Sequence, residues 1–159
     1  MKLLANSFYG RKQYDDALKT YQNILKKFPK DPSEIHYLIA TVEADRNRTP
    51  EAIAAYKKTI DTFVSAQKIV PSYIRNTYYK LGNSLYQSGK FNESIDALST
   101  AIKLFPDHSD RSWSELILAD SLKKNQNNQQ ATAQLNQLIK SESGDDIMKK
   151  VAASKLKMM

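Results

Sequence analysis

The chain of 159 residues has no cysteine, only four glycines and only five prolines. Without cysteine it can form no disulfide, no thiolate nucleophile and no cysteine-ligated metal site, in either an oxidising or a reducing compartment. A many-stranded sheet needs more turn residues than this, and no long stretch alternates apolar and polar residues with period two. The sequence therefore predicts an all-α protein.

Long apolar runs are also absent. None approaches the roughly 20 residues of a membrane span, and the polar residues Asn6, Ser7, Arg11 and Lys12 interrupt the opening segment before the core of a secretion signal can form. The composition, 41% hydrophobic and 26% charged, is typical of soluble domains. We therefore predict a soluble protein of the periplasm or cytoplasm, without a transmembrane segment.

The sequence offers little for catalysis. Its two histidines, His36 and His108, are far apart and lack the paired carboxylate or ligand spacing of an acid/base or metal site. Residues 15–16 and 145–146 are aspartate pairs at predicted helix starts, where the helix dipole favours negative charge. No glycine-rich loop could hold a phosphate. We expect no enzyme, cofactor, metal or small-molecule substrate, and a solvated His108 in a turn.

A helical hairpin is predicted over residues 75–106. Within its first helix Gly82 lacks a side chain, so a second helix can come close. Ser-Gly at 88–89 ends that helix, Asn92 can cap the next one, and Pro106 stops it. The apolar stripe of the first helix consists of Tyr78, Leu81, Leu85 and Tyr86.

The residue order in this hairpin resembles the tetratricopeptide repeat (TPR). It reads Tyr78-x2-Leu81-Gly82-x2-Leu85, then Gly89-x-Phe91-x2-Ser94-x3-Leu98-x2-Ala101, then Pro106. Less complete copies align with it, and their small residues are Ala5 and Ala17, Ala40 and Ala52, and Ala119 and Ala131. The repeat ends F-P-K-D and F-P-D-H, with their long spacing, look like bacterial envelope TPR proteins such as the Tol-Pal coordinator group.

The resemblance implies a right-handed superhelical solenoid of antiparallel helix pairs. We expect a single TPR-like domain, 1–159, that is a piece of a longer array. Its repeats would lie at about 1–31, 33–68, 72–106 and 109–141, followed by a capping or half-repeat helix at 145–159.

Some positions depart from the repeat pattern. At the bend between helices Lys12 and Asn47 replace glycine, and the fourth bend is the Asn/Gln run 125–130, which we interpret as a solvated turn. The second repeat is longer than the usual period of about 34 residues. We therefore expect residues 63–71 to lengthen its second helix. Thr49 is the expected cap of that helix.

In TPR proteins the binding residues lie on the first helix of each pair, on the face turned away from the second. Carried over by alignment, the set is rich in tyrosine, which gives large contact area with a polar tip, and in asparagine, which can pair with a peptide backbone. Packing between helices is the alternative role, since other tyrosines occupy core positions. The set is Asn6, Tyr9, Tyr37, Thr41, Asn76, Tyr79, Lys80, Asn83, Tyr86, Trp113 and Asp120.

The resemblance implies a protein–protein interaction scaffold that binds a peptide or helix of another protein in its concave groove. Self-association is a second expectation, through apolar residues at the two ends: Leu3, Leu4 and Phe8, and Ile147, Val151, Leu156 and Met158. The net charge of +7 raises nucleic acid or an anionic membrane surface as the alternative partner. The lysines are spread over several predicted helices, which argues against nucleic acid.

Overall fold

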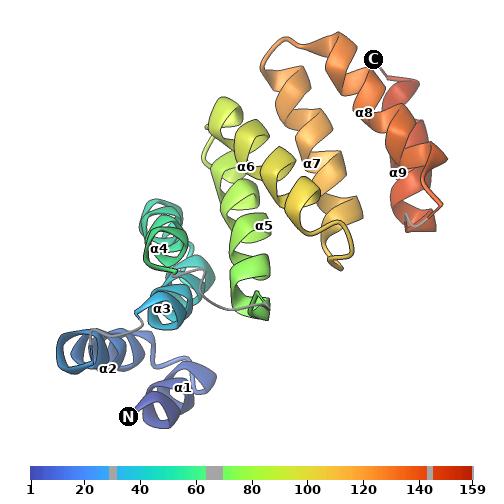
Figure 1. The fold of residues 1–159 in the computed structure, drawn as a ribbon. Coiled ribbons are helices and arrows are strands. Elements are labelled where there is room, and N and C mark those ends of the chain that lie inside the picture. The colour runs from blue at the N-terminus through green and yellow to red at the C-terminus, as the bar shows by residue number, and fades with distance from the viewer. Residues whose placement is uncertain (29–31, 64–69, 143–144, 159) are drawn as a thin grey trace. The chain divides into compact units, whose positions relative to one another are not determined.

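The structure is a computed structural model that describes residues 1–28, 32–63, 70–142 and 145–158. These residues form nine α-helices and no strand, so the predicted all-α class is confirmed (Figure 1). The chain divides into two compact units, unit 1 (Met1–Thr77) and unit 2 (Tyr78–Met159). Within the described part, no helix is long and apolar enough to cross a membrane.

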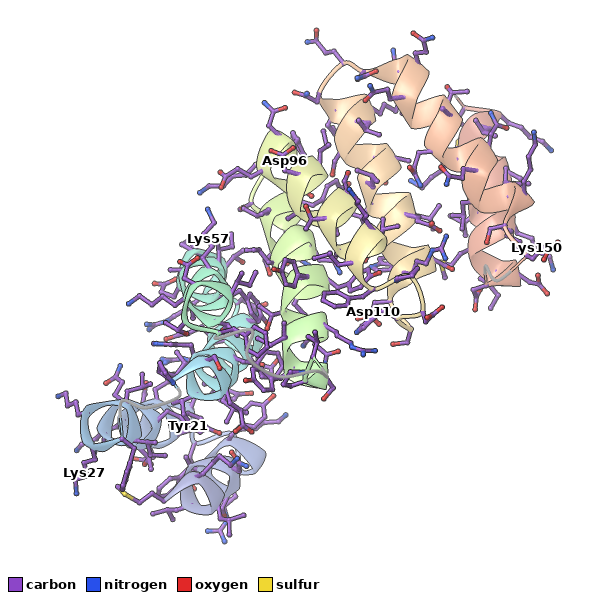
Figure 2. The ribbon with its side chains drawn as sticks, in the orientation of Figure 1. Tyr21, Lys27, Lys57, Asp96, Asp110 and Lys150 are labelled. Carbon is purple, nitrogen blue, oxygen red and sulfur yellow. The ribbon has the colours of Figure 1, made fainter. Side chains whose placement is uncertain are left out.

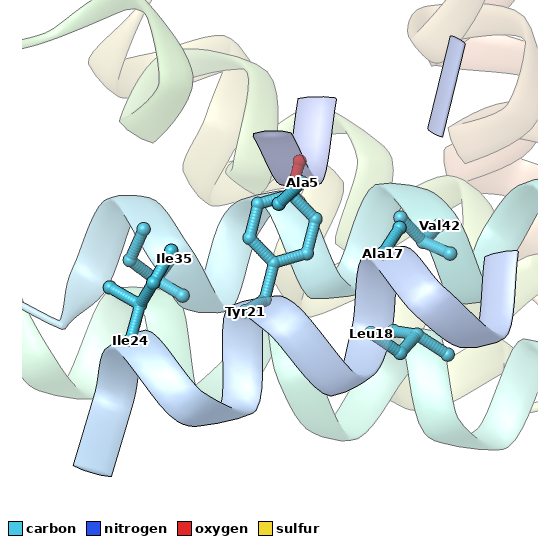
Figure 3. Close-up of a cluster of buried hydrophobic side chains, with 7 residues drawn as sticks. All are labelled: Ala5, Ala17, Leu18, Tyr21, Ile24, Ile35 and Val42. Atoms are coloured by element: carbon cyan, nitrogen blue, oxygen red, sulfur yellow. The ribbon is translucent and has the colours of Figure 1, made fainter. Parts of the chain in front are cut away.

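Unit 1 consists of helix pairs built on amphipathic faces. Helix α1 packs on α2, α3 packs on α4, and α2 also contacts α3. In its core Tyr21 is fully buried among aliphatic residues of α2 and α3 (Figure 3). The helices are α1 (Lys2–Gly10), α2 (Tyr14–Lys27), α3 (Ser33–Asp45) and α4 (Thr49–Thr62), with the start of α5 (Ser72–Gln87).

Unit 2 contains the rest of α5 and four further helices. Helix α7 packs against α6 on one side and α8 on another, and α9 contacts both α8 and α7. Leu98 of α6 joins α7 and α8 in one core cluster, while Leu116 of α7 joins α8 and α9 in another. The helices are α6 (Phe91–Leu104), α7 (Arg111–Lys124), α8 (Asn128–Lys140) and α9 (Asp146–Leu156).

The small residues of the repeat pattern lie where the two helices of a pair meet. A Cβ added to Gly82 would come 2.5 Å from Leu98 Cγ and 3.3 Å from the Leu98 backbone nitrogen. Ser94 of α6 also donates to the Gly82 carbonyl, at 2.9 Å. The corresponding small residues of the other pairs, and of α9, are at most 2% exposed: Ala5, Ala17, Ala40, Ala52, Ala119, Ala131 and Ala152.

The four bends between paired helices share one backbone geometry. Gly89 has φ of 74°, and the residues at the same place in the other bends, Lys12, Asn47 and Gln126, have φ of 60°, 60° and 62°. Each donates its amide to a carbonyl three residues earlier, as Gly89 does to Tyr86 and Gln126 to Lys123. The departures from glycine therefore leave the bend unchanged but place a side chain in the left-handed region.

Two predicted helix caps are wrong by one or two residues. Asn92 lies inside α6, whose N-cap is Lys90, and Thr49 is the first residue of α4, whose N-cap is Arg48. Neither Lys90 nor Arg48 makes a side-chain cap. These helices begin two residues after the left-handed residue, Gly89 or Asn47, so the bend and the packing decide the start instead of a capping side chain.

The predicted lengthening of α4 does not occur. The helix ends at Thr62, because the Phe63 amide turns back to the Ile60 carbonyl at 3.2 Å and the Phe63 backbone is extended. The β-branched residues Thr59, Ile60 and Thr62 also make this last turn a weak helix former. The rest of the predicted extension, residues 64–69, lies outside the described residues.

Candidate peptide-binding surface

We use the name first-helix surface for the faces of α1, α3, α5 and α7 that carry the predicted binding residues, and treat its parts in the two units separately. In unit 1 the aromatic centre is Tyr37 on α3, which is half-buried. Its ring lies 5.9 Å from that of Tyr73 and 6.4 Å from that of Tyr56. Asn76 of α5 donates to the Tyr37 hydroxyl at 3.5 Å. Tyr37 and Asn76 are therefore brought together, although far apart in sequence.

Polar contacts also join α1 to α3 on this surface. Lys2 forms an ion pair with Glu34 at 3.0 Å, and the Tyr9 hydroxyl donates to Asp45. Burial, followed by this hydrogen bond to the Asp45 carboxylate, raises the pKa of Tyr9. The Tyr9 hydroxyl therefore stays protonated at neutral pH and acts as a donor. The contact with Asp45 fixes the ring of Tyr9 relative to α3.

Two further predicted residues of unit 1 take part in local bonding. Asn6 is exposed, and its side-chain oxygen accepts a hydrogen bond from the buried Tyr21 at 2.5 Å. Thr41 donates to the Tyr37 carbonyl one helical turn earlier, at 3.0 Å. Asn6 remains open to solvent, whereas the Thr41 hydroxyl bonds within its own helix and also interacts with the Tyr56 side chain of α4.

In unit 2 the most exposed predicted residue is Trp113 at the start of α7. It is 52% exposed, although tryptophan is usually well covered in proteins. Lys80, Asn83 and Tyr86 of α5 are all half-buried. The side-chain oxygen of Asn83 is buried and has no hydrogen-bond partner within the described residues. A buried polar atom without a partner costs stability.

Asp120, further along α7, is held by the last helix. Its carboxylate accepts two hydrogen bonds from Lys155 of α9, at 2.8 and 2.9 Å. Both side chains are about one-third exposed, so this ion pair is partly screened by water. Asp120 thus joins α7 to α9 and leaves only part of its carboxylate accessible.

Tyr79 is a correction to the predicted binding set. Its side chain is fully buried, its hydroxyl donates to the Phe105 carbonyl at 2.8 Å, and its ring stacks on that of His108. The neighbouring Tyr78, expected in the core, is half-buried against the Phe105 ring at 5.5 Å. Tyr79 faces the end of its own helix pair, and we withdraw it as a binding residue.

His108 is a second correction, because a solvated turn residue was expected. The His108 side chain is only 10% exposed, and its Nδ1 accepts a hydrogen bond from the Asp110 amide at 3.1 Å. Next to it the buried Glu115 pairs with Arg111 at 3.1 Å. The sequence around His108 gives no indication of this packing, since His108 lies in the turn before α7 and its ring partner Tyr79 lies on α5.

Lysine side chains are spread over both units. Lys27 and Lys57 point outward from α2 and α4 of unit 1, and Lys150 points outward from α9 of unit 2 (Figure 2). Lys2 forms an ion pair with Glu34, and Lys155 forms one with Asp120. No group of three or more histidine and carboxylate side chains among the described residues could hold a metal ion.

Comparison with known proteins tests the family resemblance. Family models of the tetratricopeptide repeat match residues 2–63 and residues 76–108. Together the two matches cover more than half of the chain. No curated protein matches its sequence.

Solved structures of TPR proteins have the same fold. MamA (AMB-1) is 17% identical with a TM-score of 0.73, over 94% of this chain and 75% of MamA. YrrB, a TPR protein with an unusual peptide-binding site, is 13% identical with a TM-score of 0.71, over 94% of this chain and 71% of YrrB. At such identities the likeness concerns the fold alone. The repeats matched in the sequence, together with this fold, show that the chain belongs to the tetratricopeptide repeat family.

Proposed function

We propose that this chain is a protein–protein interaction scaffold whose first-helix surface binds a peptide or a helix of another protein. The observation that carries the proposal is the set of accessible aromatic and amide side chains on the first helices. Trp113 is 52% exposed, and Tyr37 and Asn76 form a polar aromatic pair on neighbouring first helices. Tryptophan and tyrosine are the residues that most often dominate binding energy at interfaces.

The chemistry of this surface favours a polypeptide over a small molecule. Asn76 and Asn6 carry amides that can pair with a peptide backbone, and the rings of Tyr37 and Trp113 offer apolar area for side chains. In the same fold YrrB has a peptide-binding site. The surface therefore combines backbone recognition with aromatic anchoring.

Affinity purification with the tagged chain, followed by mass spectrometry, would identify partners, and a purified partner can then be titrated directly. Trp113 is the only tryptophan, so its fluorescence reports on the part of the surface in unit 2. We expect its emission to shift to shorter wavelength on binding. Trp113→Ala should weaken binding by about tenfold or more, because truncation of an interface anchor typically costs at least about 2 kcal/mol.

A matched control separates this surface from other apolar positions. Leu104 is 51% exposed but lies at the end of α6, a second helix. Leu104→Ala should leave affinity unchanged, and Tyr37→Ala with Asn76→Ala tests the part in unit 1. Equal affinities of parent, Trp113→Ala and the Tyr37/Asn76 variant would contradict the proposal. Retention of nucleic acid that nuclease removes would favour the basic-module alternative.

The cellular setting belongs to the same proposal. The F-P-K-D and F-P-D-H repeat ends support a place among bacterial envelope TPR proteins. Because the proposed function is binding, we also infer a non-catalytic role. Fractionation of cells that express the full-length protein would test the compartment. Recovery in the cytoplasm alone would contradict the envelope assignment.

A further inference from the structure

The turn between α6 and α7 contains a histidine that the proposed function does not use. Residues 108–111 form a reverse turn, in which the Arg111 amide donates to the His108 carbonyl at 3.0 Å. Inside this turn the Asp110 amide donates to Nδ1 of the His108 ring at 3.1 Å. Figure 2 labels Asp110 at this turn. The ring thus holds the backbone of Asp110 in place, next to the start of α7.

This hydrogen bond fixes the protonation state of the ring. A backbone amide can only donate, so Nδ1 is the unprotonated nitrogen of a neutral imidazole. A protonated imidazole carries hydrogen on both nitrogens and can only donate. Proton uptake at Nδ1 of His108 therefore breaks the bond to the Asp110 amide, because two donors would then face each other.

A second partner for the protonated ring belongs to the same residue. Oδ2 of the Asp110 carboxylate lies 4.0 Å from His108 Nδ1, and the Asp110 side chain is half-exposed, so a small rotation brings it into hydrogen-bond distance. The other carboxylate oxygen accepts from the Ser109 hydroxyl at a long 3.4 Å. One proton thus exchanges the Asp110 amide for the Asp110 carboxylate as the partner of Nδ1.

Charged and titratable groups face the ring from each neighbouring element. The face of the Tyr79 ring of α5 is electronegative and favours a stacked cation. The carboxylates of Asp107 and Asp145 line a pocket of about 460 Å³ that the ring also lines, and they favour a positive charge as well. Burial and Arg111 of α7 oppose it, although Arg111 is itself paired with the buried Glu115. Histidine is the side chain that ordinarily changes charge between pH 5 and 8, so the exchange lies in an accessible pH range.

The bond that the proton breaks lies at the start of α7. Asp110 is the N-cap of this helix, and its side chain makes no capping hydrogen bond. Its carbonyl accepts the first bond of the helix, from the Ser114 amide at 2.9 Å. Trp113, the exposed aromatic residue of the first-helix surface in unit 2, lies in this same turn. A change in the backbone of Asp110 therefore reaches Trp113.

We propose that the turn before α7 is a proton-operated switch, in which proton uptake by His108 loosens the first turn of α7 and displaces Trp113. The switch itself needs no partner, whereas its use in regulating binding rests on the proposed function. Partner affinity at the Trp113 part of the surface should fall below pH 6 by up to about fivefold, the factor that one ordinary hydrogen bond contributes.

The switch can be tested in the intact chain without a partner. Trp113 is the only tryptophan, so its emission reports on the first turn of α7. We expect this emission to shift to longer wavelength between pH 8 and 5.5. In ¹H–¹⁵N spectra the Asp110 amide signal should move with the same midpoint as the ring signals of His108. Far-UV circular dichroism should stay constant over this range, because only one helical turn loosens.

Three variants identify the groups involved. His108→Asn is the matched variant, since asparagine can accept from the amide two residues on but takes up no proton, and its Trp113 emission should not change with pH. His36→Gln removes the only other histidine and should keep the parental change. Asp110→Asn keeps the backbone amide but removes the carboxylate that pairs with the charged ring, and should move the midpoint to lower pH.

Several results would overturn the proposal. They are a Trp113 emission and an Asp110 amide signal that stay unchanged between pH 8 and 5.5, a parental change in His108→Asn, or its loss in His36→Gln. If His108→Asn does not fold, an unmoved midpoint in Asp110→Asn would contradict the exchange. A pH-dependent Trp113 signal in a chain whose Trp113→Ala variant binds its partner like the parent would support the switch and remove the proposed function.

Discussion

The ring of His108 stacks on the ring of Tyr79 at a centroid distance of 4.4 Å and an interplanar angle of 20°. One ring comes from the turn before α7 and the other from the middle of α5. The Tyr79 hydroxyl reaches past this contact to the Phe105 carbonyl at the end of α6. Tyr79 therefore ties the α5–α6 pair to the next turn.

The first prediction concerns alkaline pH. Burial of its hydroxyl is the main cause that raises the pKa of Tyr79 to about 12, from 10.0. The unfolded chain ionises near 10, so the stability linked to this group is present below pH 10 and is lost between about pH 10 and 12. We expect urea unfolding between pH 8 and 12 to show a shallower loss of stability in Tyr79→Phe than in the parent. Identical slopes would contradict this role of Tyr79.

The second prediction concerns the close approach at Gly82. Gly82→Leu should destabilise unit 2 by at least about 1 to 3 kcal/mol, because the new side chain meets both the Leu98 side chain and its backbone. Gly10→Ala is the control, since a Cβ there would have no neighbour within 4 Å. Thermal unfolding measures both variants. A Gly82→Leu protein as stable as the parent would mean that α5 and α6 do not pack as described.

The third prediction uses the left-handed bends. Gln126→Gly should stabilise the chain by about 0.5 to 1 kcal/mol, because the left-handed conformation costs a non-glycine residue about 1 to 2 kcal/mol and glycine in turn loses part of this gain through entropy. Gly89→Ala should destabilise it by about 1 kcal/mol, although space is available, because φ is 74°. Denaturant unfolding tests both signs. Stability changes of the opposite sign would show that the backbone of the bends relaxes after substitution.

The fourth prediction concerns the exposed apolar faces of α1 and α9. Leu3 is 84% exposed and Ile147 64%, whereas Phe8 and Leu156, also expected to be exposed, are partly buried against their cores. Burial of an aliphatic side chain is worth about 1.5 to 3 kcal/mol, so we expect association at high protein concentration. Sedimentation should show dimers that Val151→Glu weakens.

A control separates apolar contact from charge in this experiment. Lys150→Gln changes the net charge by the same amount as Val151→Glu, and its side chain points away from α9 (Figure 2). We expect it to associate like the parent. Monomers at all concentrations would contradict self-association through these faces.

The sequence by itself determined the helix pairs and the points where they meet. Small residues at fixed spacing, from Ala5 to Ala152, mark where two helix backbones approach, and this is a local steric requirement that the residue type records. The bend after each first helix follows equally from the spacing of the two helices along the sequence, even where Lys12 or Gln126 replaces glycine. The handedness of the superhelix stays a prediction, as does the single domain.

Only the tertiary structure decided which polar and aromatic side chains are accessible. Adjacent tyrosines in one helix, Tyr78 and Tyr79, differ in burial because the turn that carries His108 covers one of them. Tyr37 of α3 and Asn76 of α5 likewise meet only through the packing of different helices. Burial and contacts of this kind arise between segments that are distant along the chain, so local periodicity could place the helices but could not say which residues their neighbours cover.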